Sequence, residues 1–216
     1  MTRRRKTIFV LLFCMLILTS CETPTTETSP EDLVAEYFTT MQSGNFAKAE
    51  ELLEYEEPIQ TQWTLPRLVD NLSEDHPEIR SAFEEAYGRL EYTVTDISKA
   101  EDHFQLTLVI KAPNVVKMSV DSVKDSFLWA FEQSFQDEVS TEDDIKRRSL
   151  ESLEEFLNDP GKTIHLESTV KVQVPNDADP QTLLVTEDFL KALMGNYDEI
   201  GSIFSQDFEF QRENKE

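Results

Sequence analysis

Three stretches of the chain alternate between apolar and polar residues, which is the pattern of a β-strand with one buried face. They cover residues 90–95, 103–111 and 163–174, and residues 98–102 have the length of a hairpin link between the first two. The alternation predicts an antiparallel sheet, with residues 183–185 as a short fourth strand. The positions expected to face the core are Leu90, Tyr92, Val94, Phe104, Leu106, Leu108, Ile110, Ile164, Leu166, Val170, Val172 and Val174.

Apolar residues at helical spacing precede the first strand. Ser29 suits a helix N-cap and Pro30 the first helical position, so a helix is expected to begin there and to end at Gly44, where a second helix follows. Prolines divide the next stretch into shorter helices near residues 65–72 and 77–87. The apolar face of the first two helices is predicted to consist of Leu33, Val34, Tyr37, Phe38, Met41, Phe46, Ala49, Leu52 and Leu53.

A pair of helices is expected between the second and third strands, at about residues 114–138 and 141–159. The second helix begins with Thr-Glu-Asp-Asp from Thr141, which resembles a capping box with Asp in place of the usual Glu or Gln. Pro160 and Gly161 end it. The pair, residues 114–159, is therefore expected to form an insertion in the sheet.

A final helix is expected to begin after Thr186, and residues 207–216 form a charged tail. The order of the elements predicts an α+β fold, in which helices pack on one face of an antiparallel sheet. One domain over residues 30–206 accommodates all of them. The apolar face of the final helix is predicted to comprise Phe189, Leu190, Leu193, Met194, Tyr197, Ile200 and Phe204.

The N-terminus has the pattern of a bacterial signal peptide over residues 1–20. Residues 3–6 are basic, residues 8–18 are almost continuously apolar, and small residues precede Cys21. The sequence Leu-Thr-Ser-Cys resembles the bacterial lipobox, which implies cleavage between Ser20 and Cys21 and a thioether-linked lipid on Cys21. The alternative is an ordinary secretory signal that happens to contain a cysteine. Residues 21–29 are then the lipidated cysteine and a Thr-rich flexible tether.

Net charge narrows the classes of possible partner, and cysteine content excludes a disulfide. Without residues 1–20, which hold four basic and no acidic residues, the chain has 16 basic and 43 acidic residues and a net charge of −27. Such a field repels nucleic acid and anionic lipid headgroups, so only the lipid on Cys21 is expected to enter the membrane. Cys14 is lost with the signal, which leaves no thiol for a disulfide.

The segment Ser-Pro-Glu-Asp-Leu-Val-Ala-Glu-Tyr-Phe, followed by Gly-Asn-Phe-Ala-Lys-Ala-Glu-Glu-Leu-Leu, within residues 29–53, resembles small bacterial lipoproteins of unknown function. Their single domain is of the nuclear-transport-factor-two-like, or cystatin-like, kind. The helical pair and the Val-rich strand after it are also similar to that group. The resemblance implies a cone-shaped sheet wrapped by helices. One difference is that a Lys-Trp strand usually closes that domain, whereas residues 175–185 contain no Trp.

The sequence contains few residues arranged for catalysis or metal binding. His76, His103 and His165 lack the spacing of a metal site, and no phosphate loop, nucleophile elbow or free cysteine is present, so we expect no metal and no cofactor. Domains of this cone shape can host a carboxylate and a tyrosine in an apolar cavity. Strand parity places Tyr92 and Asp96 on one side of the sheet, but a core tyrosine and a turn aspartate explain them equally, and we expect neither to be catalytic.

The sequence therefore predicts a non-enzymatic, lipid-anchored, extracytoplasmic protein that binds a partner or interacts with the cell envelope. A small-ligand carrier, or a pocket enzyme of the ketosteroid-isomerase shape, is the first alternative. A purely structural or stress-related accessory protein is the second. An exposed apolar patch favours the binding protein, and a buried pocket with convergent polar groups favours the carrier or enzyme.

Trp129 is the candidate partner contact. On a helical wheel it lies opposite the stripe formed by Val116, Val120, Val123, Phe127, Phe131 and Phe135, and its own neighbours are polar. Interface hot spots are enriched in Trp, and the 12 acidic and five basic residues of 114–159 favour a partner with a basic surface. The alternative is that Trp129 packs under Leu150 or Leu153 of the following helix.

We expect Cys21→Ser to abolish acylation and membrane retention, because the acyl chains are the only part of the mature chain expected to enter the bilayer. Membrane fractionation and intact-mass spectrometry measure the two effects. An unmodified Cys21 thiol in the wild-type mature protein contradicts the prediction.

Overall fold

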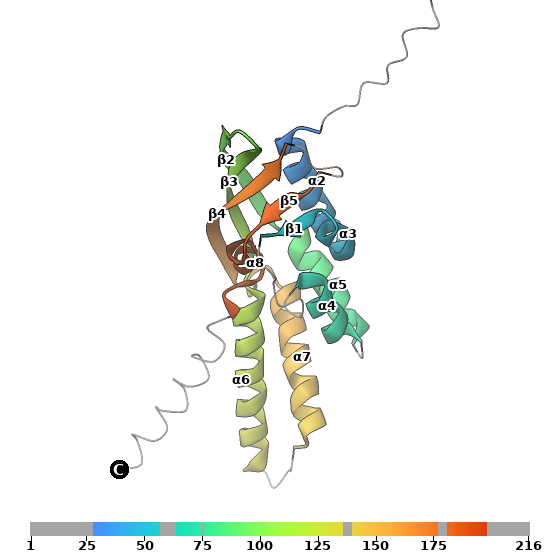
Figure 1. Ribbon diagram of the computed structural model, residues 1–216. Helices are drawn as coiled ribbons and strands as arrows, with labels where there is room; N and C mark the ends of the chain where they lie inside the picture. Colours follow the sequence, from blue (N-terminus) through green and yellow to red (C-terminus); the bar gives the residue numbers. More distant parts are fainter. Residues whose placement is uncertain (1–27, 57–63, 75, 136–139, 177–180, 198–216) are drawn as a thin grey trace, which may run out of the picture.

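The computed structural model describes residues 28–56, 64–74, 76–135, 140–176 and 181–197. Its centre is a five-stranded sheet in the order β1-β5-β4-β3-β2 (Figure 1). Strands β2 (Glu91–Lys99), β3 (His103–Pro113) and β4 (His165–Pro175) pair antiparallel, as the sequence predicts. The short strand β5 (Leu183–Val185) lies antiparallel to β4.

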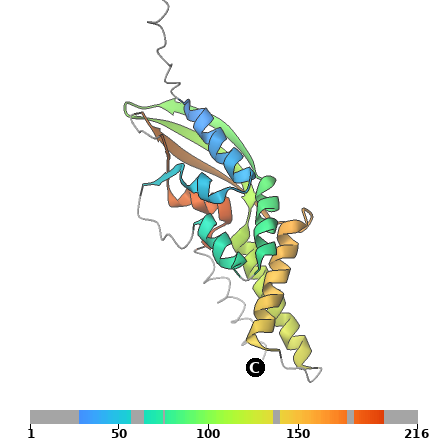
Figure 2. The same cartoon turned by 90° about the vertical axis from the view of Figure 1, so that its right-hand side faces the viewer.

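The inner face of the sheet is buried under helices, which confirms the α+β fold class. Leu106, Leu108 and Ile110 of β3 are fully buried, and Phe104 packs against the same core. Helix α2 (Pro30–Gln42) packs on the inner face of the sheet, where the ring of Phe38 stacks on that of Tyr92 with centroids 4.1 Å apart. Figure 2 shows α2 running along the strands.

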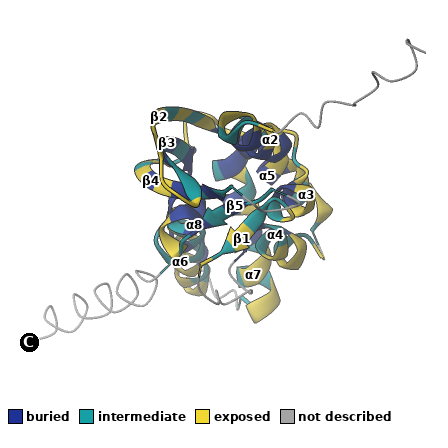
Figure 3. Ribbon diagram, turned by 45° about the horizontal axis from the view of Figure 1, so that its top comes forward, coloured by how far each residue is buried: buried dark blue, intermediate teal, exposed yellow. Residues whose placement is uncertain are grey.

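The remaining helices complete this layer. They are α3 (Phe46–Glu50), α4 (Leu65–Ser73), α5 (Pro77–Gly88) and α8 (Glu187–Met194). Tyr87 of α5 is buried, and its hydroxyl donates to the carbonyl oxygen of Leu193 in α8 at 2.9 Å. Helices α2 and α8 show large dark blue areas in Figure 3, whereas edge strand β2 is teal and yellow. The sheet therefore has one core face and one open face.

Helices α6 (Val115–Ser134) and α7 (Glu142–Asn158) form the expected insertion. They lie side by side and project beyond the end of the sheet, at the end of the molecule opposite to the start of α2 (Figures 1 and 2). The Thr141–Asp144 capping box is confirmed, and its hydrogen bonds hold the pKa of the Asp144 carboxyl below its usual range. No helix in the described ranges is long and apolar enough to cross a membrane.

Leu53, which the sequence predicts to lie on the apolar face of a helix, lies in a β-strand instead. Residues 53–55 form β1 (Leu53–Tyr55), which pairs in parallel with β5, so the sheet is not purely antiparallel. The backbone of Leu52 accepts a hydrogen bond from Leu183 N at 2.8 Å. The partner strand β5 lies far away in the sequence, so the apolar spacing near residues 53–55 does not predict this pairing.

The predicted final helix is also too long. Helix α8 ends at Met194, because Gly195 adopts φ 103°, a left-handed conformation that a helix cannot contain. Ile200 and Phe204 lie outside the described residues.

We expect Leu108→Ala to lower the free energy of unfolding by about 2–5 kcal/mol, because a fully buried side chain between Val94 and Val170 is replaced by a cavity. Val109→Ala is the matched control on the open face of the same strand, with an expected loss of about 1 kcal/mol or less. Urea denaturation measures both. Equal losses would contradict the assignment of the two faces.

Candidate docking surface

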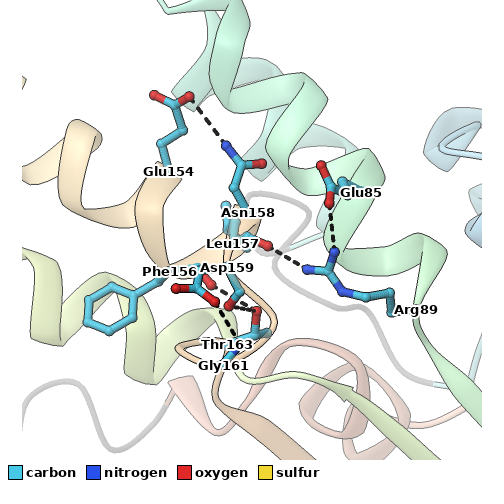
Figure 4. Close-up of polar contacts among 9 residues, drawn as sticks. All are labelled: Glu85, Arg89, Glu154, Phe156, Leu157, Asn158, Asp159, Gly161 and Thr163. Atoms are coloured by element: carbon cyan, nitrogen blue, oxygen red, sulfur yellow. Dashed lines mark hydrogen bonds and ion pairs between the residues drawn. The ribbon is translucent and has the colours of Figure 1, made fainter.

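Polar contacts fix the base of the α6–α7 hairpin to the domain. Arg89, which follows α5, donates through Nη2 to the carbonyl oxygen of Leu157 at 2.6 Å and through Nη1 to Glu85 at 3.0 Å (Figure 4). The Thr163 hydroxyl donates to the carbonyl oxygens of Phe156 and Asp159 at 2.9 and 3.0 Å. These groups satisfy carbonyls at the end of α7, where a cation also interacts favourably with the helix dipole.

Small residues lie on the inner side of α6. Ser122 and Ser126 are fully buried, and their hydroxyls donate to the backbone carbonyls of Met118 and Val123 at 2.8 and 2.7 Å. Each hydroxyl is thereby satisfied within its own helix. Asp125 of α6 and Arg148 of α7 join the two helices by an ion pair of 3.3 Å.

Large apolar side chains of α6 point into solvent instead. Phe127, Leu128, Phe131 and Phe135 are 58%, 64%, 62% and 75% exposed. They fall within about 100° of one another around the helix axis and so form one surface. The rings of Phe131 and Phe135 meet edge to face at 4.8 Å. We call these four residues the α6 patch.

The α6 patch is the exposed end of a longer stripe. Val120 is 4% exposed, while Val116 and Val123 are half-buried. The stripe is therefore largely buried in the first half of α6 and exposed in the second half. Four side chains exposed by more than half leave roughly 500 Å² of apolar surface, which lies within the range of the largest patches on monomeric proteins, and such patches are often functional.

A groove of about 580 Å³ borders the patch between α6 and α7. Leu128 and Phe156 supply its apolar walls, and Lys124 and Arg148 are among its charged residues. Arg148 is engaged with Asp125, and Lys162 at one end of the groove pairs with Glu155. The groove therefore extends the apolar surface of Leu128, while its other lining residues are polar or charged: Asp121, Lys124, Asp125, Arg148, Ser152, Glu155 and Lys162.

Charge is unevenly distributed over the hairpin. Helix α6 carries Lys117, Lys124, Asp121, Asp125 and Glu132, a net charge of −1, whereas α7 holds six acidic and three basic residues. Lys117 pairs with Asp121 at 2.8 Å, and Asp125 pairs with Arg148. The negative charge that favours a basic partner thus belongs to α7 rather than to the helix that carries the patch.

Trp129 lies on the opposite side of α6 from the patch. It is partly buried and shares the side of the helix that holds the buried Ser122 and Ser126. This position suits the packing alternative better than the docking one. The role of Trp129 as a partner contact stays a prediction. The large apolar side chains of α6 that solvent reaches most are those of the α6 patch.

The parity argument for Tyr92 and Asp96 is wrong. A β-bulge between Val94 and Asp96 shifts the register, so Asp96 pairs with Thr107 on the open face, whereas Tyr92 pairs with Ile110 on the core face. The two side chains therefore face opposite sides of the sheet. Asp96 is exposed, and Tyr92 stacks on Phe38.

A different carboxylate–tyrosine pair lies at the other edge of the sheet. The Tyr55 hydroxyl donates to Glu50 Oε1 at 2.6 Å. Burial raises the pKa of the Glu50 carboxyl, while the hydrogen bond from Tyr55 opposes that shift. The hydrogen bond explains why a half-buried carboxylate is tolerated there.

The other predicted site residues lie apart from these features. Ser20 and Cys21 are outside the described residues. His76 and His103 contact the neighbouring carboxylates Glu78 and Asp102 at 3.1 and 2.7 Å, and His165 is exposed. Within the described ranges, no group of three or more His, Cys, Asp or Glu side chains is arranged to hold a metal ion.

Sequence reasoning found the stripe on α6 but not its exposure. Helical spacing shows that Phe127, Phe131 and Phe135 share a face, and an apolar face is normally taken as the packed one. Here the packed side is the one with small residues. The signal that could have revealed this is the Ser122–Ser126 pair at i, i+4, which permits close approach of a second helix.

Comparison of the chain with protein-family models, curated proteins and solved structures finds no match.

We expect Arg89→Met to lower the free energy of unfolding by about 1–3 kcal/mol, because the Leu157 carbonyl loses a charged donor. Arg80→Met is the matched control. It removes an exposed ion pair with Asp70 and should cost about 1 kcal/mol or less. Thermal denaturation of both variants checks the difference, and equal effects would contradict a special role of Arg89 at the hairpin base.

Proposed function

We propose that this protein is a lipid-anchored, extracytoplasmic docking protein without enzymatic activity, and that the α6 patch is its binding surface. The observation that carries the proposal is the exposure of Phe127, Leu128, Phe131 and Phe135 on one projecting helix. A partner that buries the remaining exposed surface of one of these side chains gains about 1–2 kcal/mol, because each side chain is already partly covered.

The placement of the patch supports this proposal. The hairpin projects from the end of the molecule opposite to the start of α2, where the Thr-rich segment that follows Cys21 joins the domain. With a lipid on Cys21, the hairpin can extend away from the bilayer. The patch is then presented to partners beyond the headgroups rather than to the lipid itself.

The cystatin-like resemblance remains part of the proposal. Its support is an opening helix packed across the inner face of an antiparallel strand trio, with the hairpin inserted between β3 and β4. In this interpretation the sheet and its covering helices are the scaffold, and the insertion carries the binding surface.

Phe131→Asp in the full-length chain tests the docking surface. We expect the complex that a lysine-directed crosslinker captures in intact membranes to shrink to the size of the single chain, because a carboxylate in an apolar contact costs several kcal/mol. The variant should fold normally, since Phe131 is 62% exposed. Denaturing-gel mobility after crosslinking and thermal denaturation measure the two effects.

Thr169→Asp is the matched control, because it adds the same charge at an exposed position on the open face of β4. It should leave the complex intact. A complex that persists unchanged in Phe131→Asp refutes the α6 patch as the docking surface.

A further inference from the structure

We infer that the occupant of the α6 patch is the same patch of a second copy of this chain, with the two α6 helices running parallel about a two-fold axis. This inference rests on the proposed function and names the partner. In this dimer the projecting hairpins of the two anchored copies, with two helices each, meet in a four-helix contact.

The shape of the surface suits self-association. The patch is a stripe of exposed side chains along one helix. A two-fold interface joins the same surface on both subunits, and apolar side chains on facing helices interdigitate readily in such pairs. Phe127 and Phe131 are spaced i, i+4, which is a ridge of the kind that packs between helices.

Charge selects this surface for contact between copies. Without residues 1–20 the chain has a net charge of −27, so most approaches of one copy to another are repulsive. Helix α6 has a net charge of −1, and its Asp121 and Asp125 are already paired with Lys117 and Arg148. The α6 patch therefore combines apolar surface with little self-repulsion, and a strongly basic partner would find little to bind there.

The anchor selects the orientation. The start of α2 and the tip of the hairpin lie at opposite ends of the molecule (Figures 1 and 2). Parallel α6 helices place both tethers at the same end, so both copies can be anchored in one membrane. Antiparallel helices would place the two tethers at opposite ends of the dimer.

The area of the patch indicates where the dimer forms. Roughly 500 Å² of apolar surface per copy is less than the ~800 Å² that each partner buries in a standard interface. In solution the contact should be weak. Confinement of two anchored copies to a membrane raises their effective concentration and compensates for the small area.

Cysteine crosslinking in native membranes tests this inference. The lipidated Cys21 sulfur is a thioether, so the mature chain has no other thiol and each introduced cysteine is unique. Phe127→Cys, Phe131→Cys and Ser134→Cys sample one face of α6 over two turns, and Thr169→Cys on the open sheet face reports random collisions. We expect disulfide-linked dimers for all three α6 positions, at about tenfold or more above the Thr169→Cys background.

The pattern of crosslinks decides the orientation. Residues 127 and 134 are ~10 Å apart along the helix, whereas disulfide formation needs Cα atoms within about 7 Å. Parallel helices let each position crosslink with itself. Self-crosslinking at position 131 alone, with a mixed crosslink between 127 and 134, would show antiparallel helices and overturn the inference. Background crosslinking at all three positions would also overturn it.

Labelling separates failure of the inference from failure of the proposed function. A membrane-impermeant maleimide is applied from the extracytoplasmic side to the Phe131→Cys variant, with Thr169→Cys as the reference. Slow labelling without self-crosslinking means that another partner covers the patch, so the proposed function stands and the inference fails. Slow labelling that becomes fast on deletion of residues 198–216 assigns the cover to the chain's own C-terminus and overturns both. Labelling as fast as that of the reference also overturns both.

Discussion

The pairing of β3 with β4 is the constraint on which the rest of the structure depends. It joins 11 residue pairs, from His103 opposite Pro175 to Pro113 opposite His165. In this last pair, Pro113 directly precedes the insertion and His165 directly follows it. The next residues inward are also joined, because Asn114 N donates to the Ile164 carbonyl oxygen at 2.7 Å. The two ends of the hairpin are thereby fixed at one edge of the domain. Helix α6 leaves the sheet where β3 ends, and only its first turns can be covered by the core.

This geometry explains the exposure of the Phe residues. The same helical stripe is buried at Val120 and open at Phe127 and Phe131, further along the helix. Helix α7 does not cover these Phe side chains, because the side of α6 that is buried is the opposite one, which carries the small residues Ser122 and Ser126. The Arg89 and Thr163 contacts at the end of α7 hold the hairpin in this direction.

Net charge and exposed apolar surface act together in the proposed assembly. A chain with 43 acidic and 20 basic residues is protected from indiscriminate aggregation by self-repulsion. That protection is locally relaxed on α6, where Asp121 and Asp125 form ion pairs with Lys117 and Arg148. The position of the tethers sets the orientation of the contact, and the small area of the patch makes it weak in solution, which suits an interaction that forms only between copies held in one membrane.

The sequence by itself determined most of the local structure. Strict alternation predicted β2, β3 and β4 and their core faces, and the caps at Ser29 and Thr141 marked helix starts, because these signals act between residues close in the chain. Tertiary structure decided the rest. Strand β1 exists because β5 hydrogen-bonds to it, the bulge after Val94 turns Asp96 outward, and the packed side of α6 depends on the path that β3 and β4 impose on the hairpin. A helical stripe records which side chains lie together, but whether a neighbour covers them is set by contacts between segments far apart in sequence.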